Sequence, residues 1–147
     1  MITRRVALAL VGATIASPTL ANRPAIYKGN NNVAVNGYDV VGYYSEGAPV
    51  EGQADFRANW MGTTWQFANA ANRDLFAATP EAYAPQYGGH CAYAASKGAL
   101  ASTVPEAWTI VGGKLYLNYS LGVRDIWRRD ITANIVLADG FWPSLHA

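Results

Sequence analysis

A single cysteine, Cys91, restricts how this chain of 147 residues folds. One thiol forms no disulfide within its own chain, which excludes the framework of crosslinks that stabilises many small exported domains. A zinc site built from several cysteines of one chain is excluded for the same reason. The fold must therefore be stabilised by a hydrophobic core, and a composition that is 51% hydrophobic and 12% aromatic supplies the residues for one.

Residues 1–21 have the three parts of a bacterial secretory signal peptide. Arg4 and Arg5 form a basic head, eleven uncharged residues follow, and the small residue Ala21 ends the segment. This apolar run is far shorter than the roughly 20 residues that cross a bilayer, so we expect cleavage after Ala21 and no permanent membrane span. An uncleaved anchor is the main alternative, and Thr3-Arg4-Arg5 also resembles a twin-arginine signal. The sequence predicts a periplasmic or secreted protein.

After such a cleavage 126 residues remain, which is enough for one domain with a modest core. Without the two leader arginines, nine basic and ten acidic residues are left. This balance gives no electrostatic footprint for nucleic acid or an anionic membrane. We divide the mature chain into a polar N-terminal arm, residues 22–34, and a domain, residues 35–147.

Two β-hairpins are predicted from apolar residues that alternate with polar ones on either side of a short turn. In residues 55–67 this alternation surrounds a turn at residues 61–63. In residues 108–118 two runs of β-forming residues flank Gly112-Gly113, which is a typical two-residue hairpin turn.

Helices are predicted between and after the hairpins. Asn69 is a suitable N-cap for a helix over residues 70–79. Ser120 is a suitable cap for a long helix over residues 121–138, which Gly140 would close. The apolar face predicted for this helix consists of Val123, Trp127, Ile131, Ile135 and Ala138. The opposite, charged face consists of Arg124, Asp125, Arg128 and Arg129. Two hairpins interleaved with short helices and followed by a long amphipathic helix define a small α+β domain.

Several spaced sequence blocks resemble the exported, free-standing form of the bacterial YHS-domain proteins. The blocks are GYDVVGYY, W-x-G-x-x-W-x-F, ANRDLF, PEAYAPQYGGHCAYA, GGKLYLNYS and a closing W…AD-x-x-WP, and together they cover about residues 35–145. The resemblance implies that residues 35–147 form a YHS-type domain, a kind of metal-binding module that occurs beside heavy-metal transport proteins. Short members carry two cysteines after the hairpin, where this chain has Ala68 and Asn72. In the long form the cysteine lies in the block GG-x-CA, which here places it at Cys91.

Cys91 and the adjacent His90 are the first candidates for a metal site. Thiolate and imidazole suit Cu(I) and zinc, and Gly88-Gly89 permits a backbone bend that turns both side chains toward one point. One cysteine and one histidine do not fill a tetrahedral zinc shell, so a copper ion at low coordination is the first choice and zinc the second. Further ligands would come from a second copy of the chain, from a metal-handling partner protein, or from the weaker candidates Asp39, Tyr87 and His146.

The weaker candidates also have structural interpretations. An aspartate at a turn, such as Asp39, commonly accepts hydrogen bonds from nearby backbone N–H groups. Tyr87 belongs to an aromatic-rich segment that is typical of a core. Met61, at a hairpin turn, would offer a thioether to copper.

Cys91 itself admits three further interpretations: a buried structural thiol, a catalytic thiol, and an intermolecular disulfide. Free cysteine is among the most buried residue types. A catalytic thiol needs a base, and His90 is poorly placed because adjacent side chains on a regular element point apart. The alternative functions are a non-catalytic ligand- or partner-binding module with a structural cysteine and, third, a small thiol-dependent enzyme. The sequence contains no G-x-S-x-G, H-E-x-x-H, C-x-x-C or phosphate-loop motif, which favours a protein that is not an enzyme.

Overall fold

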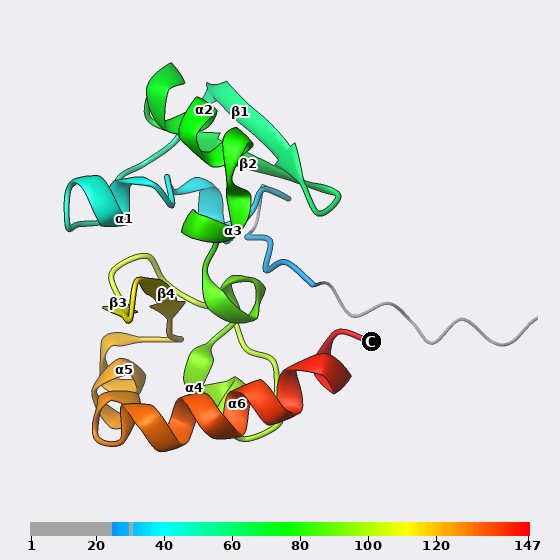
Figure 1. The fold of residues 1–147 in the computed structure, drawn as a ribbon, viewed down its shortest axis with the longest axis vertical. Coiled ribbons are helices and arrows are strands. Elements are labelled where there is room, and N and C mark those ends of the chain that lie inside the picture. The colour runs from blue at the N-terminus through cyan, green and yellow to red at the C-terminus, as the bar shows by residue number, and fades with distance from the viewer. Residues whose placement is uncertain (1–24, 30) are drawn as a thin grey trace, which may run out of the picture.

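Two antiparallel hairpins, β1–β2 and β3–β4, lie one above the other in Figure 1. The buried apolar residues form two hydrophobic cores. The computed structural model describes residues 25–29 and 31–147, and the predicted signal peptide lies outside this range. The order of helices and hairpins confirms the predicted α+β class.

The first hairpin pairs β1 (Gln53–Trp60) with β2 (Thr63–Phe67). Trp60 pairs with Thr63, so the turn consists of Met61 and Gly62 alone and is one residue shorter than predicted. Both turn residues have a positive φ, 53° and 66°, which is what the right-handed twist of a two-residue hairpin requires.

Short helices surround this hairpin: η1 (Val35–Gly37), α1 (Gly42–Ser45), α2 (Ala70–Ala78) and α3 (Pro80–Tyr83). The side chain of Asn69 accepts a hydrogen bond from the backbone N–H of Asn72 at 2.8 Å, which confirms the predicted cap of α2. The first core consists of buried residues from these elements, from the segments that connect or precede them, and from β4: Ile26, Ala34, Val35, Val40, Val41, Tyr43, Trp65, Phe67, Phe76, Ala84, Leu115 and Leu117.

The second half of the chain contains η2 (Gln86–Gly89), α4 (Ala92–Ser96), β3 (Trp108–Val111), β4 (Lys114–Leu117), α5 (Leu121–Arg128) and α6 (Ile131–Leu145). Seven of its buried residues form the second core: Tyr87, Ala92, Ala95, Tyr116, Trp127, Ala138 and Leu145. Successive side chains of a strand point to opposite faces, so β4 serves both cores, with Leu115 and Leu117 in the first and Tyr116 in the second.

The predicted single helix over residues 121–138 is two helices, α5 and α6. Asp130 separates them because its side chain accepts a hydrogen bond from the N–H of Ala133 at 3.2 Å and so caps a new helix. Gly140 does not close α6 either. It lacks the left-handed φ of a C-terminal glycine, and the helix continues until Leu145 packs into the second core.

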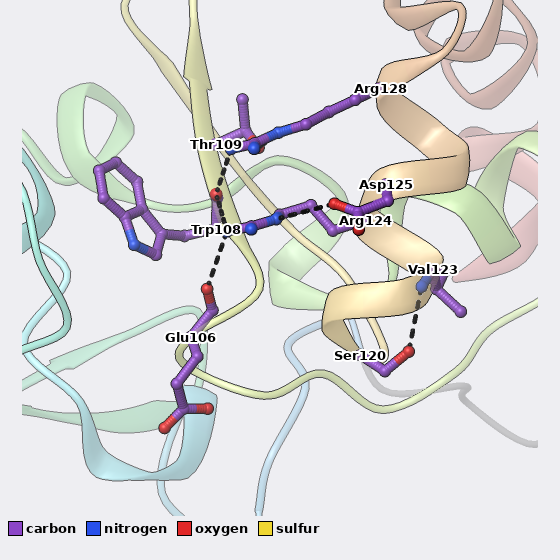
Figure 2. Close-up of polar contacts among 8 residues, drawn as sticks. All are labelled: Glu106, Trp108, Thr109, Ser120, Val123, Arg124, Asp125 and Arg128. Atoms are coloured by element: carbon purple, nitrogen blue, oxygen red, sulfur yellow. Dashed lines mark hydrogen bonds and ion pairs between the residues drawn. The ribbon is translucent and has the colours of Figure 1, made fainter.

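Helix α5 is fixed to β3 by two arginines that were predicted to face solvent (Figure 2). Arg124 donates to the carbonyl oxygens of Glu106 and Trp108 at 3.1 and 3.5 Å. Arg128 donates to the hydroxyl group of Thr109 at 3.0 Å and to the carbonyl oxygen of Trp108 at 3.3 Å. The polar face of this helix therefore contributes to the fold as well as to solvation.

The described part of the N-terminal arm packs into the domain. Ile26 is buried in the first core, Tyr27 donates its backbone N–H to the carbonyl oxygen of Gly88 at 2.8 Å, and Val33 forms a parallel bridge with Thr64. Among the described residues, none of the helices has the length and apolar character needed to cross a membrane.

Candidate functional site

Three consecutive left-handed residues precede the His90-Cys91 pair. Tyr87, Gly88 and Gly89 have φ values of 57°, 62° and 81°. A Cβ atom at Gly88 would collide with the carbonyl oxygen of Ala25, and one at Gly89 would collide with the side chain of Val35, so both positions require glycine. The turn predicted from the sequence is present, and it sets the directions of the side chains on either side of it.

The sulfur of Cys91 lies within a closed set of hydrogen bonds. Cys91 is 1% exposed and caps α4, where its Sγ accepts from the N–H of Ala94 at 3.5 Å. The N–H of Tyr119 also donates to Sγ at 3.3 Å, and the thiol is 3.5 Å from the carbonyl oxygen of the Asn118 side chain. The sulfur is thus held by the start of α4 and by the segment that follows β4.

The ring of His90 has different neighbours. It lies against Tyr27 and Trp142, with ring centroids 5.8 and 6.0 Å apart, and only 5% of the residue is exposed. The bend at Gly88-Gly89 thus leaves the imidazole among aromatic rings while the sulfur of Cys91 faces Asn118 and Tyr119. Within residues 25–29 and 31–147 there is no group of three or more His, Cys, Asp or Glu residues placed to hold a metal ion.

Asp39 is a structural carboxylate. It is fully buried, and its Oδ1 accepts from the N–H groups of Val41 and Gly42 at 2.9 and 3.2 Å. Its Oδ2 accepts from the N–H of Ala68 at 2.9 Å and from the side-chain amide of Asn72 at 2.8 Å. The carboxylate therefore connects the start of α1 to the end of β2 and to α2.

A pocket of about 220 Å³ lies between the two cores. Its walls come from the tip of the β1–β2 hairpin, from the segment between α3 and η2, and from the end of α6, and Figure 1 shows the hairpin tip and this helix end on the same side of the molecule. The side chains that matter for its chemistry are Trp60, Met61, Glu81, Tyr87, Trp142 and His146.

Two contacts hold the ring of His146 in this pocket. Its Nδ1 is 2.8 Å from the carbonyl oxygen of Trp142, one turn earlier in α6. A carbonyl oxygen only accepts, so Nδ1 carries a proton and donates it. The ring also stacks on the Trp142 indole, with centroids 4.4 Å apart and planes 30° apart.

Met61 occupies an unusual position for its residue type. It is 58% exposed and left-handed, with a φ of 53°, at a turn position that asparagine, aspartate or glycine usually fills. A large apolar side chain in that conformation carries both a strain cost and an exposure cost, and such outliers concentrate at functional sites.

Tyr87 is a buried hydrogen-bond donor. Its hydroxyl group donates to Oδ1 of Asp139 at 2.9 Å. Burial, and secondly the hydrogen bond and negative charge of Asp139, raise the pKa of Tyr87 far above its usual value. The phenol therefore stays protonated at neutral pH and is a poor metal ligand in this state.

The structure brings together a different pair of candidates from the one the sequence favoured. Met61 and His146 line one pocket with Tyr87, whereas Asp39 and Cys91 lie elsewhere in hydrogen-bonded surroundings. Sequence reasoning did not identify Glu81 and Trp142 as pocket residues, because no local motif links the hairpin, α3 and the end of α6.

A scan against protein-family models and searches of curated proteins and of solved structures gave no match to this chain. The function is therefore inferred from the residues themselves and from their arrangement.

Proposed function

We propose that this protein is an exported binding module of the YHS type, that it holds a small ligand or metal ion in the pocket between its two cores, and that it is not an enzyme. The observation that carries this proposal is the composition of the pocket. Two tryptophans, a histidine and a methionine from distant parts of the chain line an open pocket together with the polar side chains of Glu81 and Gln86. A concave site in which aromatic side chains meet several polar groups is typical of ligand sites.

The surroundings of Cys91 support a non-catalytic role. A nucleophilic thiol must reach its substrate and must have a base within hydrogen-bonding distance. The sulfur of Cys91 is instead buried and engaged with Asn118 and with the backbone of α4 and Tyr119. Thiol-dependent catalysis is therefore the least supported of the three functions.

The pocket position also suggests what binding would do to the protein. An occupant there touches the first core through Trp60 and the second core through Tyr87 and Trp142. Because a ligand that binds only the folded state stabilises that state, occupancy is expected to raise the unfolding temperature of the whole domain.

A screen of the purified chain tests this proposal. Metal ions and small organic compounds are added to ¹⁵N-labelled protein, and the indole N–H resonances of the five tryptophans are followed. We expect at least one compound or ion to shift Trp60 and Trp142, while Trp127, which belongs to α5 and is fully buried in the second core, serves as the control. Hits that shift residues away from the pocket, or the complete absence of hits, would contradict the proposal.

Export is tested separately. Mass spectrometry of periplasmic material should find a chain that begins at or near Asn22. Full-length chain confined to the cytosol would remove export from the proposal without affecting the pocket.

A further inference from the structure

We propose that the exposed side of α6 is an interaction surface, and that its partner is α6 of a second copy of this chain, packed antiparallel in a dimer with twofold symmetry. This inference goes beyond the proposed function and does not depend on it. The residues of α6 that line the pocket, Trp142 and His146, are not part of the surface.

Helix α6 has one covered side and one open side. The covered side packs against α4 and carries the buried residues Asn134, Ala138 and Leu145. The open side exposes three large apolar side chains close together: Val136, Leu137 and Phe141. Figure 1 shows this helix along the end of the molecule that is opposite the first hairpin. A cluster of exposed apolar side chains on one helix face is typical of an interaction site.

The open side also has the residue spacing of a helix-packing seam. Four exposed residues follow one another at intervals of four, three and four positions: Ala133, Leu137, Gly140 and Ser144. This is the spacing of the a and d positions of a coiled coil, which keeps the side chains in one row along the helix. Three of the four side chains are small or absent, and the distance between two packed helices depends on the side chains at the contact. The row therefore allows a second helix to come close.

Gly140 is the residue that indicates a partner outside the chain. Glycine inside a helix is destabilising relative to alanine, so its presence needs a reason. Gly140 does not have a positive φ, and a Cβ atom there would meet nothing within 4 Å. Neither the backbone nor the packing of the chain itself therefore requires glycine at this position. A partner that approaches the helix closely does require it.

The missing side chain leaves a shallow groove of about 220 Å³, which is lined by Val136, Leu137, Gly140 and Phe141. One border of this groove is held in place by the body of the protein. The ring of Phe141 lies over Gly98, where a Cβ atom would be 3.4 Å from the ring. The groove is thus a fixed feature of the surface that can receive an apolar side chain.

The groove fits a side chain that lies next to it on the same helix. Leu137 is about one turn before Gly140. When two copies of α6 run antiparallel, with the twofold axis midway between these two residues, Leu137 of each copy lies over Gly140 of the other. Val136 of each copy then faces Phe141 of the other. The same contact is made twice, as in the interface of a twofold-symmetric dimer, so a second copy is the partner that this surface fits.

The distribution of charge favours the antiparallel arrangement. The only charged residue of α6 is Asp139, which accepts a hydrogen bond from Tyr87 and is not part of the row. Arg129 comes shortly before α6, is exposed, and its side chain has no hydrogen bond or ion pair with the described residues. The last turn of α6 contains no basic residue. Antiparallel pairing brings Arg129 of each copy to this end of the other helix, where the last carbonyl groups carry a partial negative charge.

The experiment measures the mass of the purified chain by analytical ultracentrifugation at increasing concentration. Two helix faces of this length form a small interface, so we expect a reversible dimer that populates between about 10 μM and about 1 mM. Leu137→Glu places two carboxylates beside the twofold axis and should weaken dimerisation at least about tenfold. Leu75→Glu is the matched control, because Leu75 lies on α2 and is 49% exposed, against 46% for Leu137. This control should dimerise within about twofold of the wild type.

Gly140→Gln separates a lost contact from a folding defect. Glutamine has a higher helix propensity than glycine, and its side chain meets no atom of its own chain, so the unfolding temperature of the monomer should rise. The same side chain fills the groove, so dimerisation should weaken at least about tenfold. The two effects have opposite signs, which a misfolded variant would not produce.

The orientation of the helices is tested with a nitroxide label at Thr132→Cys, on the exposed part of α6 beside the row. Cys91 is buried, so the label attaches to the new cysteine. Labelled chain is mixed with unlabelled ¹⁵N chain, and line broadening is recorded for the ¹⁵N chain alone. Antiparallel pairing predicts the strongest broadening at residues 144–147.

Three results would overturn this proposal. The first is a wild-type chain that stays monomeric at every concentration. The second is a dimer that Leu137→Glu leaves intact, or that Leu75→Glu weakens to the same extent. The third is strongest broadening near residue 132 of the ¹⁵N chain, which would show a parallel pair. None of these results bears on the pocket, whose ligands are detected by the resonances of Trp60 and Trp142.

Discussion

The hydroxyl group of Tyr87 donates a hydrogen bond to Oδ1 of Asp139 at 2.9 Å, and this contact ties the left-handed turn before His90 to helix α6. Tyr87 forms one wall of the pocket, and α6 carries Trp142 and His146 toward another. The same hydrogen bond therefore helps to set how the pocket walls face each other. Its loss in Tyr87→Phe should disturb both stability and the pocket.

The buried tyrosines predict how stability depends on alkaline pH. Burial raises the pKa of Tyr43 and Tyr87 far above the ordinary value of 10.0. Above pH 10 the unfolded chain releases these protons while the folded protein keeps them, so the contribution of these two phenols to the free energy of unfolding is fully present below pH 10 and is lost as the pH rises further. Alkaline titration followed at 295 nm should show these two phenols ionising only together with unfolding. Ionisation of all the tyrosines, Tyr43 and Tyr87 included, in protein that remains folded would contradict this prediction.

Tyr87→Phe removes one hydrogen bond to a carboxylate and leaves the ring in place. We expect a loss of about 1–2 kcal/mol in the free energy of unfolding, within the range for hydrogen bonds to charged groups when one partner can return to water. Tyr119→Phe is the matched control, because Tyr119 is 54% exposed and should change stability little. Urea denaturation of the two variants measures the difference, and equal stabilities would show that the Tyr87–Asp139 contact contributes nothing.

Trp127→Ala tests the phase of α5. Trp127 is fully buried and contacts Tyr116 at 5.2 Å between ring centroids, so its truncation should cost about 3–5 kcal/mol. Arg128→Ala should cost less than about 1 kcal/mol, because its contacts with Trp108 and Thr109 are exposed (Figure 2). Chemical denaturation that finds equal losses would show that a different face of the helix is buried.

The carboxylate of Asp39 accepts four hydrogen bonds, two on each oxygen. In Asp39→Asn one of these oxygens becomes an NH₂ group, which cannot accept and faces two N–H donors. We expect a loss of about 3 kcal/mol or more, since buried donors are then left unpaired. Asp125→Asn, at a side chain that is 68% exposed on α5, is the control. The measurement is again urea denaturation, and a cost for Asp39→Asn no larger than that of the control would contradict the structural role.

The buried position of Cys91 predicts its reactivity. In folded protein, iodoacetamide should modify Cys91 only as fast as local opening exposes its sulfur, and labelling should become rapid when denaturant is added. A fast reaction at neutral pH in native buffer would favour an activated, accessible thiol and restore the enzymatic alternative.

The elements that local chemistry specifies were predictable from sequence. Asn69 and Ser120 cap their helices as expected, with backbone N–H groups at 2.8 and 3.1 Å, and Gly112-Gly113 forms the turn between β3 and β4. The break at Asp130 was not predicted, because the apolar periodicity continues across it. An aspartate directly before the apolar run that starts at Ile131 is nevertheless a recognisable capping signal.

The candidate site was less predictable. Met61 and His146 were each considered as single ligands, but nothing in the sequence indicates that the first hairpin and the end of α6 share a pocket. His90 and Cys91 were considered together because they are adjacent in the sequence. Their side chains nevertheless have different neighbours, because they follow three consecutive left-handed residues. The combined geometry of three such residues cannot be predicted from local sequence rules.

A crystal structure of the chain soaked with the compound or ion that shifts the Trp60 and Trp142 indole resonances tests the central claim most directly. The account predicts difference density in the pocket between the tip of the hairpin β1–β2 and the end of α6, against Trp142 and His146. Density elsewhere on the molecule, with ordered pocket side chains and nothing bound beside them, would contradict it.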